Sequence, residues 1–194
     1  SRTGTHAIVD AAIDTNEITN YLRNDPVAIL ITHGHSDHIA FLDNYVKDYP
    51  RATILGHPDS KLTERYPNFK KVDNNQEFII GEMRFKCIHT PGHYFDSICY
   101  QICPVLFTGD TMFVGRTGRI KGKCSSIEDL YDSIYNKILK MPGGIKIYPG
   151  HDYGNKPNIT LKENILNSPL LSANSLDEFK ERMDDYEKNR KIGS

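Results

Sequence analysis

Three histidines and one aspartate lie within six residues of each other, at His33, His35, Asp37 and His38. Imidazole nitrogens and carboxylate oxygens are ligands that bind zinc at about 2.0–2.2 Å. In a chain of this length the pattern H-x-H-x-D-H is expected by chance on the order of 0.001 times. The short spacing lets His33 and His35 face one ion while Asp37 and His38 reach another. The segment therefore predicts a metal site.

Three further segments place a potential ligand in a glycine-containing turn that follows a predicted strand, namely His93, Asp110 and His151. Each segment alone is weak evidence, because a histidine after such a turn is usually a surface residue. Together with the first segment they supply seven candidate metal ligands at strand ends: His33, His35, Asp37, His38, His93, Asp110 and His151. A carboxylate such as Asp110 can bridge two ions, and hydrolytic enzymes commonly use two metals about 3.5–4 Å apart.

The elements around the first segment predict strands and helices in alternation. Residues 27–31 form a continuous apolar run, which is typical of a strand buried on both faces. The loop that contains the first four candidate ligands, residues 33–38, is called the ligand loop. It follows this run and precedes residues 39–46, in which apolar residues recur at helical spacing. Residues 77–80 and 83–88 predict a hairpin, because the glycine of the pair Gly81 and Glu82 suits a type II′ turn.

The second half of the chain repeats this mixture. Strands are expected at residues 97–103, 105–108 and 145–148, and helices at residues 127–141, 161–166 and 176–186. The capping-box pattern at residues 125–128 indicates where the first of these helices begins. Strands in runs with helices inserted between them predict an α+β fold of two sheets covered by outer helices. We expect one domain over residues 1–194, with a short helical C-terminal tail from about residue 155.

The composition excludes several classes of function. A formal net charge of -1 provides no general attraction to nucleic acid or to an anionic membrane. The apolar runs are far shorter than the ~18 residues of a membrane span, and no signal sequence opens the chain. Four cysteines without a C-x-x-C pair predict reduced thiols. We therefore expect a cytoplasmic protein, a monomer or a homodimer, whose partner is a small molecule.

The ligand segments resemble the metallo-β-lactamase superfamily, and within it the glyoxalase II (hydroxyacylglutathione hydrolase) group and the related persulfide dioxygenases. The supporting segments are residues 89–93, 106–115 and 147–153, and the resemblance extends from Ile8 to about Met183. It implies a four-layer αββα sandwich with the site along one edge of the sheets. Family members usually carry one or two strands before residues 7–10, so a short or missing N-terminal strand is expected here.

The resemblance also implies how the seven ligands are shared between two metals. The first metal would be held by His33, His35 and His93, and the second by Asp37, His38 and His151, with Asp110 between them. Two Zn²⁺ ions per chain are expected, and Fe²⁺ is the alternative in one or both sites. The implied enzyme is a binuclear metallohydrolase.

The implied reaction is hydrolysis of an S-acylglutathione thioester, such as S-lactoylglutathione, by a metal-bound hydroxide that Asp37 orients as a catalytic residue. A thiolate with a conjugate-acid pKa of ~8.5 leaves without a strong general acid. Arg119 matches a basic residue that contacts glutathione in the family, and Tyr153 matches a tyrosine. Lys121 stands where the family has a second tyrosine. We expect these three residues to bind substrate.

Two alternatives to the thioesterase remain open. A glutathione persulfide dioxygenase would hold a single iron with two histidines and one aspartate, and the residues that match this triad are His33, His93 and Asp110. The other alternative is a non-catalytic metal-binding module. A secreted β-lactamase is disfavoured by the missing signal and by the pair Asp37 and His38, and a nuclease is disfavoured by the net charge.

Overall fold

The computed structural model describes residues 2–189, and these divide into two compact units. The first unit comprises Ser1–His89 and Asp96–Ile102, and the second comprises Thr90–Phe95 and Cys103–Ser194. The expectation of one domain stays a prediction. Since each unit carries part of the ligand set, the units are described in turn.

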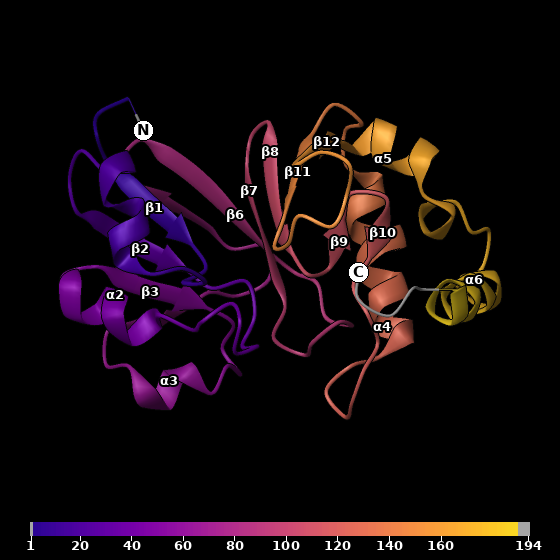
Figure 1. Cartoon of the computed structure of the whole chain (residues 1–194), viewed down its shortest axis with the longest axis horizontal. Helices are drawn as coiled ribbons and strands as arrows, with labels where there is room; N and C mark the ends of the chain where they lie inside the picture. The colour runs from indigo at the N-terminus through magenta and orange to yellow at the C-terminus, as the bar shows by residue number, and fades with distance from the viewer. Residues whose placement is uncertain (1, 190–194) are drawn as a thin grey trace. The chain divides into compact units, whose positions relative to one another are not determined.

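The first unit contains a parallel sheet of four strands in the order β1-β2-β3-β4, with helices beside it (Figure 1). Its elements are β1 (His6–Val9), α1 (Thr15–Ile18), a 3-10 turn (Thr19–Tyr21), β2 (Pro26–Leu30), α2 (Leu42–Asp48), β3 (Thr53–Gly56), α3 (Leu62–Arg65) and β4 (Phe69–Lys71). An antiparallel set follows, consisting of β5 (Glu77–Ile80), β6 (Met83–His89) and β7 (Ile98–Ile102). The hairpin prediction is confirmed, with Gly81 at a φ of 60° in the turn. No strand precedes β1 within residues 2–5, the part of that segment described.

A tyrosine on β7 ties the antiparallel strands of this unit to its parallel sheet. The hydroxyl of Tyr100, which is fully buried, lies within hydrogen-bond distance of the carbonyl oxygens of Ile31, at 2.9 Å, and Leu55, at 3.2 Å. Ile31 directly follows β2 and precedes the segment that contains the four candidate ligands. The hydrogen bond from Tyr100 therefore holds the backbone at the start of the loop that contains the candidate ligands. A preorganised site requires such support.

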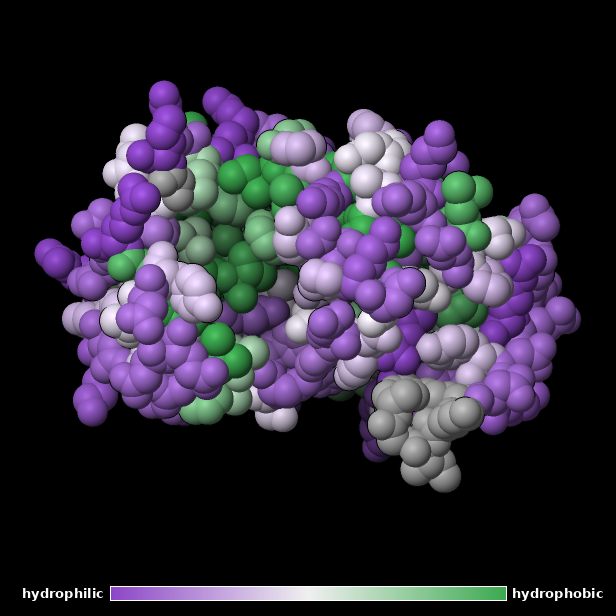
Figure 2. Space-filling view, turned by 45° about the horizontal axis from the view of Figure 1, so that its top comes forward, coloured by the Kyte–Doolittle hydropathy of each residue, from purple (hydrophilic) through white to green (hydrophobic). Residues whose placement is uncertain are grey.

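One expectation about β2 needs correction. The apolar run at residues 27–31 is a strand, but Val27 is 47% exposed rather than buried on both faces. Val27 lines an open groove of about 350 Å³ together with Leu55 and residues of β5, among them Ile79, which is 61% exposed. Apolar side chains gather in a hollow on the face shown in Figure 2. The sequence pattern cannot reveal this exposure, because it depends on how the sheets pack.

The cysteines of the first unit give a testable consequence of this packing. Burial raises the pKa of the Cys87 thiol to about 12, and Cys99 is also buried, whereas Cys103 and Cys124 are exposed. Since the thiolate is the reactive species, we expect a thiol reagent at pH 8 to label two of the four cysteines in the folded protein and all four in denaturant. Mass spectrometry of the labelled peptides measures this. Rapid native labelling of Cys87 would contradict the described core.

The second unit is built around β8 (Val105–Gly109), which pairs in parallel with β11 (Lys146–Pro149). Its other elements are β9 (Met112–Phe113), β10 (Arg116–Thr117), α4 (Ile127–Tyr131), a π-helical segment (Asp132–Lys137), a 3-10 turn (Ile138–Lys140), β12 (Ile159–Thr160), α5 (Leu161–Asn167), a second 3-10 turn (Pro169–Leu171) and α6 (Leu176–Asn189). The strands β8 and β11 and the helical tail therefore occur where the sequence predicts them, whereas β9, β10 and β12 were not predicted. Within the described residues, no helix is long and apolar enough to cross a membrane.

The helix predicted at residues 127–141 begins at Ile127 as expected, but its N-cap residue and its interior differ from the prediction. Its N-cap is Ser126, whose Oγ accepts a hydrogen bond from the Asp129 backbone at 3.1 Å, whereas Ser125 donates to the Gly122 carbonyl in the preceding turn. The helix then passes into a π-helical segment. Its predicted apolar face is nevertheless buried, since Ile134 and Ile138 are both 0% exposed.

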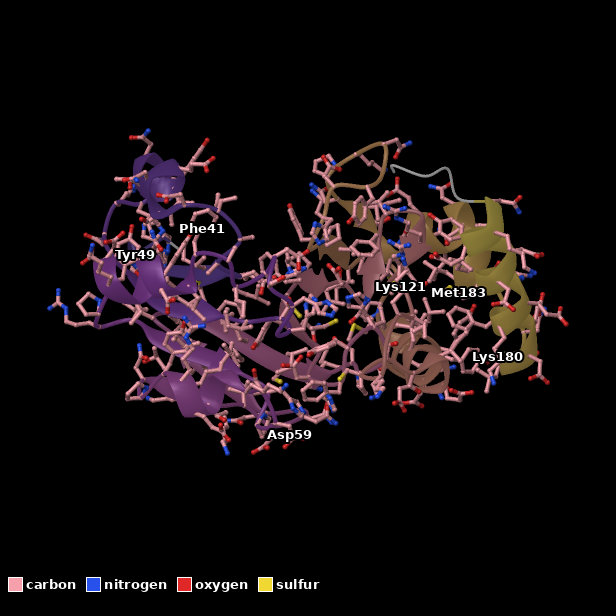
Figure 3. The ribbon with its side chains drawn as sticks, turned by 60° about the horizontal axis from the view of Figure 1, so that its bottom comes forward. Phe41, Tyr49, Asp59, Lys121, Lys180 and Met183 are labelled. Atoms are coloured by element: carbon pink, nitrogen blue, oxygen red, sulfur yellow. The ribbon has the colours of Figure 1, made fainter. Side chains whose placement is uncertain are left out.

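The C-terminal helix α6 packs against the β9–β10 hairpin of the same unit. Met183 is 4% exposed, and the Thr117 hydroxyl of β10 lies 3.3 Å from its sulfur. Figure 3 shows Met183 and Lys180 on this helix. Tyr186, one turn further along α6, lies next to Arg116 of β10. This helix therefore contributes side chains to the region around the second set of candidate ligands.

Candidate functional site

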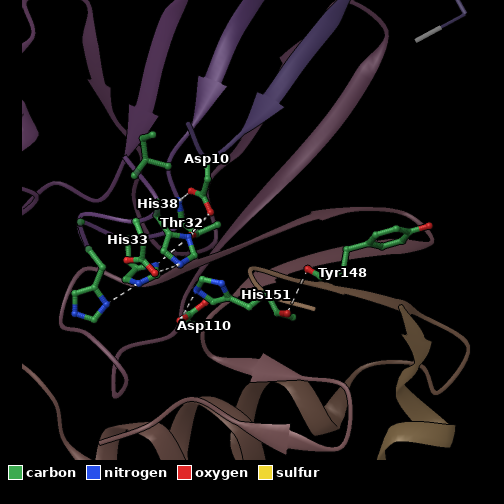
Figure 4. Close-up of polar contacts among 12 residues, drawn as sticks. Asp10, Thr32, His33, His38, Asp110, Tyr148 and His151 are labelled. Carbon is green, nitrogen blue, oxygen red and sulfur yellow. Dashed lines mark hydrogen bonds and ion pairs between the residues drawn. The ribbon is translucent and has the colours of Figure 1, made fainter. Parts of the chain in front are cut away.

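In the first unit, the buried carboxylate of Asp10 organises the ligand loop (Figure 4). Its Oδ1 accepts a hydrogen bond from the Thr32 backbone, and its Oδ2 accepts one from the Thr32 hydroxyl, both at 2.8 Å. The Nδ1 of His38 lies 2.7 Å from the same Oδ2. A carboxylate only accepts, so His38 carries its proton on Nδ1 and presents the lone pair of Nε2 as a metal ligand.

The same reasoning fixes the tautomer of His33, which is 1% exposed. Its Nδ1 lies 3.1 Å from the Thr32 hydroxyl oxygen. The single hydroxyl hydrogen of Thr32 is already donated to Asp10, so His33 must be the donor in this contact. Its Nε2 then presents a lone pair. Asp10 therefore orients two candidate ligands, one directly and one through Thr32.

The four candidate ligands of the first unit lie close together, and the rings of His33 and His38 are also adjacent, with centroids 4.0 Å apart. The division into two pairs stays a prediction. The Nε2 of His33 lies 2.9 Å from the Nδ1 of His35, close to the separation of about 3.3 Å that two nitrogens have on one tetrahedral zinc. The Oδ2 of Asp37 lies 4.0 Å from the Nε2 of His38. The Asp37 side chain is 57% exposed, so it is the member of the set that solvent reaches most readily.

The turn between the first two histidines is held by a second buried carboxylate. Asp96, 2% exposed, accepts a hydrogen bond from the Gly34 backbone at 3.1 Å. Burial raises the pKa of Asp96 above its usual range, and the hydrogen bond from Gly34 opposes that shift. The carboxylate reaches back from the segment that precedes β7, 62 residues further along the chain. Such a contact restricts the directions that His33 and His35 can face.

In the second unit, Asp110 lies between two imidazoles. Its Oδ2 is 3.6 Å from the Nε2 of His93 and 3.5 Å from the Nε2 of His151, and Asp110 is 9% exposed. The ring of His151 stacks on Tyr153, with centroids 5.0 Å apart. The structure thus brings together the three candidate ligands of this unit around one carboxylate oxygen. The distances of 3.5–3.6 Å between Asp110 Oδ2 and the two imidazole nitrogens are compatible with binding to common metal ions.

His93 is held in place by backbone contacts. Its Nδ1 donates to the Arg119 carbonyl oxygen at 2.9 Å, which leaves Nε2 with a lone pair. Gly92, at a φ of 134°, precedes it, and a Cβ at Gly92 would lie 2.3 Å from the backbone of Leu130 in α4. No other residue type fits this close approach. The turn therefore rests directly on the helix, and this fixes the position from which His93 projects.

A small cavity lies beside these ligands in the second unit. It measures about 30 Å³ and is lined by His93, Asp110, Phe113, Arg116, Thr117, Arg119, Tyr153 and Tyr186. Of the residues predicted to bind substrate, Arg119 and Tyr153 line this cavity. Lys121 is exposed and is not among its lining residues. Arg119 approaches Glu187 of α6, with Nη2 and Oε2 3.5 Å apart.

Two residues of the site were missed by the sequence analysis. Asp10 could have been found, because it follows the apolar run of β1 just as the other ligands follow their strands. Arg116 carries no comparable signal. Its sequence neighbours do not reveal that it is 9% exposed or that it lines the cavity beside Asp110.

The donor set fits divalent metal ions. Within each unit the facing atoms are imidazole nitrogens and carboxylate oxygens, the ligands of zinc and of non-haem iron. His33, His38 and His93 each have the second nitrogen engaged in a hydrogen bond, as metal-binding histidines generally do. No thiolate takes part. The chemistry of the residues therefore agrees with the zinc or iron expected from the sequence.

Replacing Asp10 with alanine is expected to destabilise the fold by about 2–4 kcal/mol, because it leaves the buried Thr32 backbone and His38 without their acceptor. Urea unfolding of the metal-free protein measures this effect without interference from metal binding. Asp25→Ala, at an exposed aspartate of the same unit, serves as the control. A change below about 0.5 kcal/mol at Asp10 would contradict the network described.

The sequence was compared with protein-family models and with known proteins. The family model described as the metallo-beta-lactamase superfamily matches residues 2–151. The chain is 35% identical over 154 residues to a hydroxyacylglutathione hydrolase of Francisella tularensis subsp. novicida, covering 76% of this chain and 59% of that enzyme. It is 29% identical over 160 residues to the probable polyketide biosynthesis zinc-dependent hydrolase PksB of Bacillus subtilis, covering 80% and 71%.

Solved structures confirm the α+β fold predicted from the sequence. The structure of ETHE1 from Myxococcus xanthus matches with a TM-score of 0.84 and 26% identity, covering 98% of this chain and 83% of that one. The B3 metallo-beta-lactamase BLEG-1 matches with a TM-score of 0.76 and 27% identity, covering 89% and 91%. Both similarities extend over the two units of the chain.

Proposed function

Since the chain belongs to the metallo-β-lactamase superfamily of metal-dependent hydrolases, we propose that it is a binuclear thioesterase that acts on S-acylglutathione, such as S-lactoylglutathione. One observation carries the proposal. The carboxylate of Asp37 and the imidazole of His38 form a second pair of ligands, and Asp10 fixes His38 in the tautomer that a metal needs. In the single-iron alternative, Asp37 and His38 would not be metal ligands.

The seven candidate ligands would hold two metals. The first ion would be held by His33, His35 and His93 and the second by Asp37, His38 and His151, with Asp110 contributing to both. Bound zinc or iron would supply a water of lowered pKa as the nucleophile and would polarise the thioester carbonyl. The matched family model spans both sets of ligands, which supports their joint use.

The residues of the chain have distinct tasks in this reaction. Asp37, the most exposed of the ligands in the first unit, would accept a hydrogen bond from the attacking water and orient it. Arg119 and Tyr153 would contact the substrate from the walls of the cavity beside Asp110. Lys121 would contact it from the exposed loop. The departing thiolate has a conjugate-acid pKa of ~8.5 and needs no general acid.

A relative supports the choice of substrate. The matched Francisella enzyme is named a hydroxyacylglutathione hydrolase, and the chain spans 59% of its length. The zinc-dependent hydrolase PksB is related at lower identity. Two zinc ions per chain are our expectation, with iron as the alternative.

A glutathione persulfide dioxygenase with one iron is the second candidate. The chain is similar to ETHE1 from Myxococcus xanthus over 98% of its length, and the candidate iron ligands His33, His93 and Asp110 are present. This function makes no use of Asp37 and His38 as ligands. The occupancy of the second metal therefore separates the two candidates.

The deciding experiment measures metal content beside activity on two substrates. The purified protein is analysed for zinc and iron per chain, and it is assayed for hydrolysis of S-lactoylglutathione and for oxygen uptake with glutathione persulfide. Two metals per chain with thioester hydrolysis are expected. One iron per chain with oxygen uptake would replace this proposal with the dioxygenase. Bound metal without turnover of either substrate would indicate a non-catalytic module.

A further inference from the structure

Arg116 is a buried arginine in the hairpin next to the candidate ligands of the second unit. It forms β10 with Thr117, and this strand pairs with β9 so that Arg116 lies opposite Phe113. The residue is 9% exposed. A guanidinium keeps its positive charge in proteins, so the fold pays to remove this charge from water. We therefore examine which neighbouring groups interact with the buried guanidinium and offset its loss of hydration.

The contacts of Arg116 compensate only in part. Its Nη1 donates a hydrogen bond to the Tyr186 hydroxyl at 3.0 Å, and its Cζ lies 3.9 Å from the centre of the Tyr153 ring. The buried Nε has no hydrogen-bond partner. Among the described residues, no carboxylate forms an ion pair with this guanidinium. One charged edge, made of Nε and Nη2, is thus without a protein acceptor.

The neighbouring arginine, Arg119, also has a buried Nε without a hydrogen-bond partner, but its other contacts differ. Arg119 lines the same cavity, but its guanidinium lies 3.5 Å from the Glu187 carboxylate, and its side chain is 37% exposed. Its charge is therefore both partly solvated and partly compensated. Arg116 has no carboxylate partner among the described residues, and it is only 9% exposed. The two arginines of this cavity therefore differ in how far their charge is compensated by a carboxylate and by solvent.

The location of Arg116 indicates which anion it would meet. It lines the cavity of about 30 Å³ together with Asp110 and His93. That space holds one or two waters, which is about the size of a carboxylate. Tyr186 also lines a larger cavity of about 550 Å³ in the same unit, where the remainder of a ligand could extend. A carboxylate bound to Arg116 would lie close to the reacting group.

We propose that Arg116 is a specificity-determining residue that binds a carboxylate of the substrate through its Nε and Nη2, so that the enzyme prefers thioesters that carry a carboxylate. This inference rests on the proposed thioesterase function. Two parallel hydrogen bonds from a guanidinium edge match a carboxylate in geometry and charge. The carboxylate could belong to the acyl group or to the thiol, and matched substrates distinguish these sources.

The kinetic test compares thioesters that differ in the carboxylates of the acyl group or of the thiol. S-succinylglutathione is paired with S-butyrylglutathione to test the acyl group, and S-lactoylglutathione is paired with its glutathione diester to test the thiol. Arg116→Gln is expected to raise KM about 10–100-fold for the member of one pair that has the carboxylate in question, either on the acyl group or on glutathione, with little change for the member that lacks it. Arg116→Lys should give an intermediate value. Arg84→Gln, at an arginine 69% exposed in the first unit, is the control.

A direct binding measurement keeps the inference testable without turnover. The Nε–H resonance of Arg116, assigned by its absence in Arg116→Lys, should shift when succinate or glutathione is added but not when their diesters are added. If the wild-type protein hydrolyses no thioester, the proposed function fails and this shift alone decides the role of Arg116. Equal kinetic losses on all four substrates, or an unmoved resonance, would overturn the inference. Circular dichroism confirms that each variant is folded.

Discussion

Replacing Asp110 with asparagine is expected to remove metal from both sites and to lower thioester hydrolysis by more than about 100-fold. Loss of a residue that merely supports a ligand costs about 10–100-fold, and Asp110 is in a position to be a ligand itself. Its Oδ2 lies 3.5–3.6 Å from the ligand nitrogens of both His93 and His151. A neutral amide would be a weak substitute for a carboxylate shared by two cations.

Metal analysis after gel filtration and steady-state kinetics measure this effect. Asp59→Asn is the matched control, because Asp59 is an aspartate of the first unit with a side chain 77% exposed (Figure 3). Thermal unfolding of the metal-free proteins shows whether the variant is intact. Full metal content in Asp110→Asn would remove Asp110 from the ligand set.

Replacing His38 with alanine is expected to reduce the metal content from two ions to one and to lower thioester hydrolysis by at least about 100-fold. His38 is 2% exposed, and its Nδ1 is held 2.7 Å from Asp10, so no neighbouring side chain can readily take its place. A single-iron dioxygenase would keep its metal and its activity in this variant, because His38 is not one of its ligands.

Metal content and both activities are measured on the same preparation of His38→Ala. His6→Gln is the control, at a histidine of β1 whose Nε2 accepts a hydrogen bond from the Arg23 backbone. Unchanged hydrolysis with an unchanged number of metals would show that the pair formed by Asp37 and His38 is dispensable. The binuclear proposal would then have to be abandoned.

The sequence by itself determined the ligand types, their order and the strands that carry them. The spacing of His33, His35, Asp37 and His38 is local, and the structure places these four side chains close together. The hairpin at Gly81 was also predictable, because a turn of two residues depends on the backbone conformations that those residues adopt. Local patterns were sufficient wherever a feature depends on residues close together in the chain.

Only the tertiary structure decided how the ligands are oriented and what lies beside them. Asp10 fixes the tautomer of His38 across 28 residues, and Asp96 holds Gly34 across 62. The burial of Arg116 depends on Tyr186, 70 residues away in α6. Hydrogen bonds and burial of this kind join segments that are brought together by packing, and a one-dimensional pattern does not record them. The candidate metal ligands could therefore be proposed from the sequence, whereas the groups that orient them and the proposed carboxylate site could not.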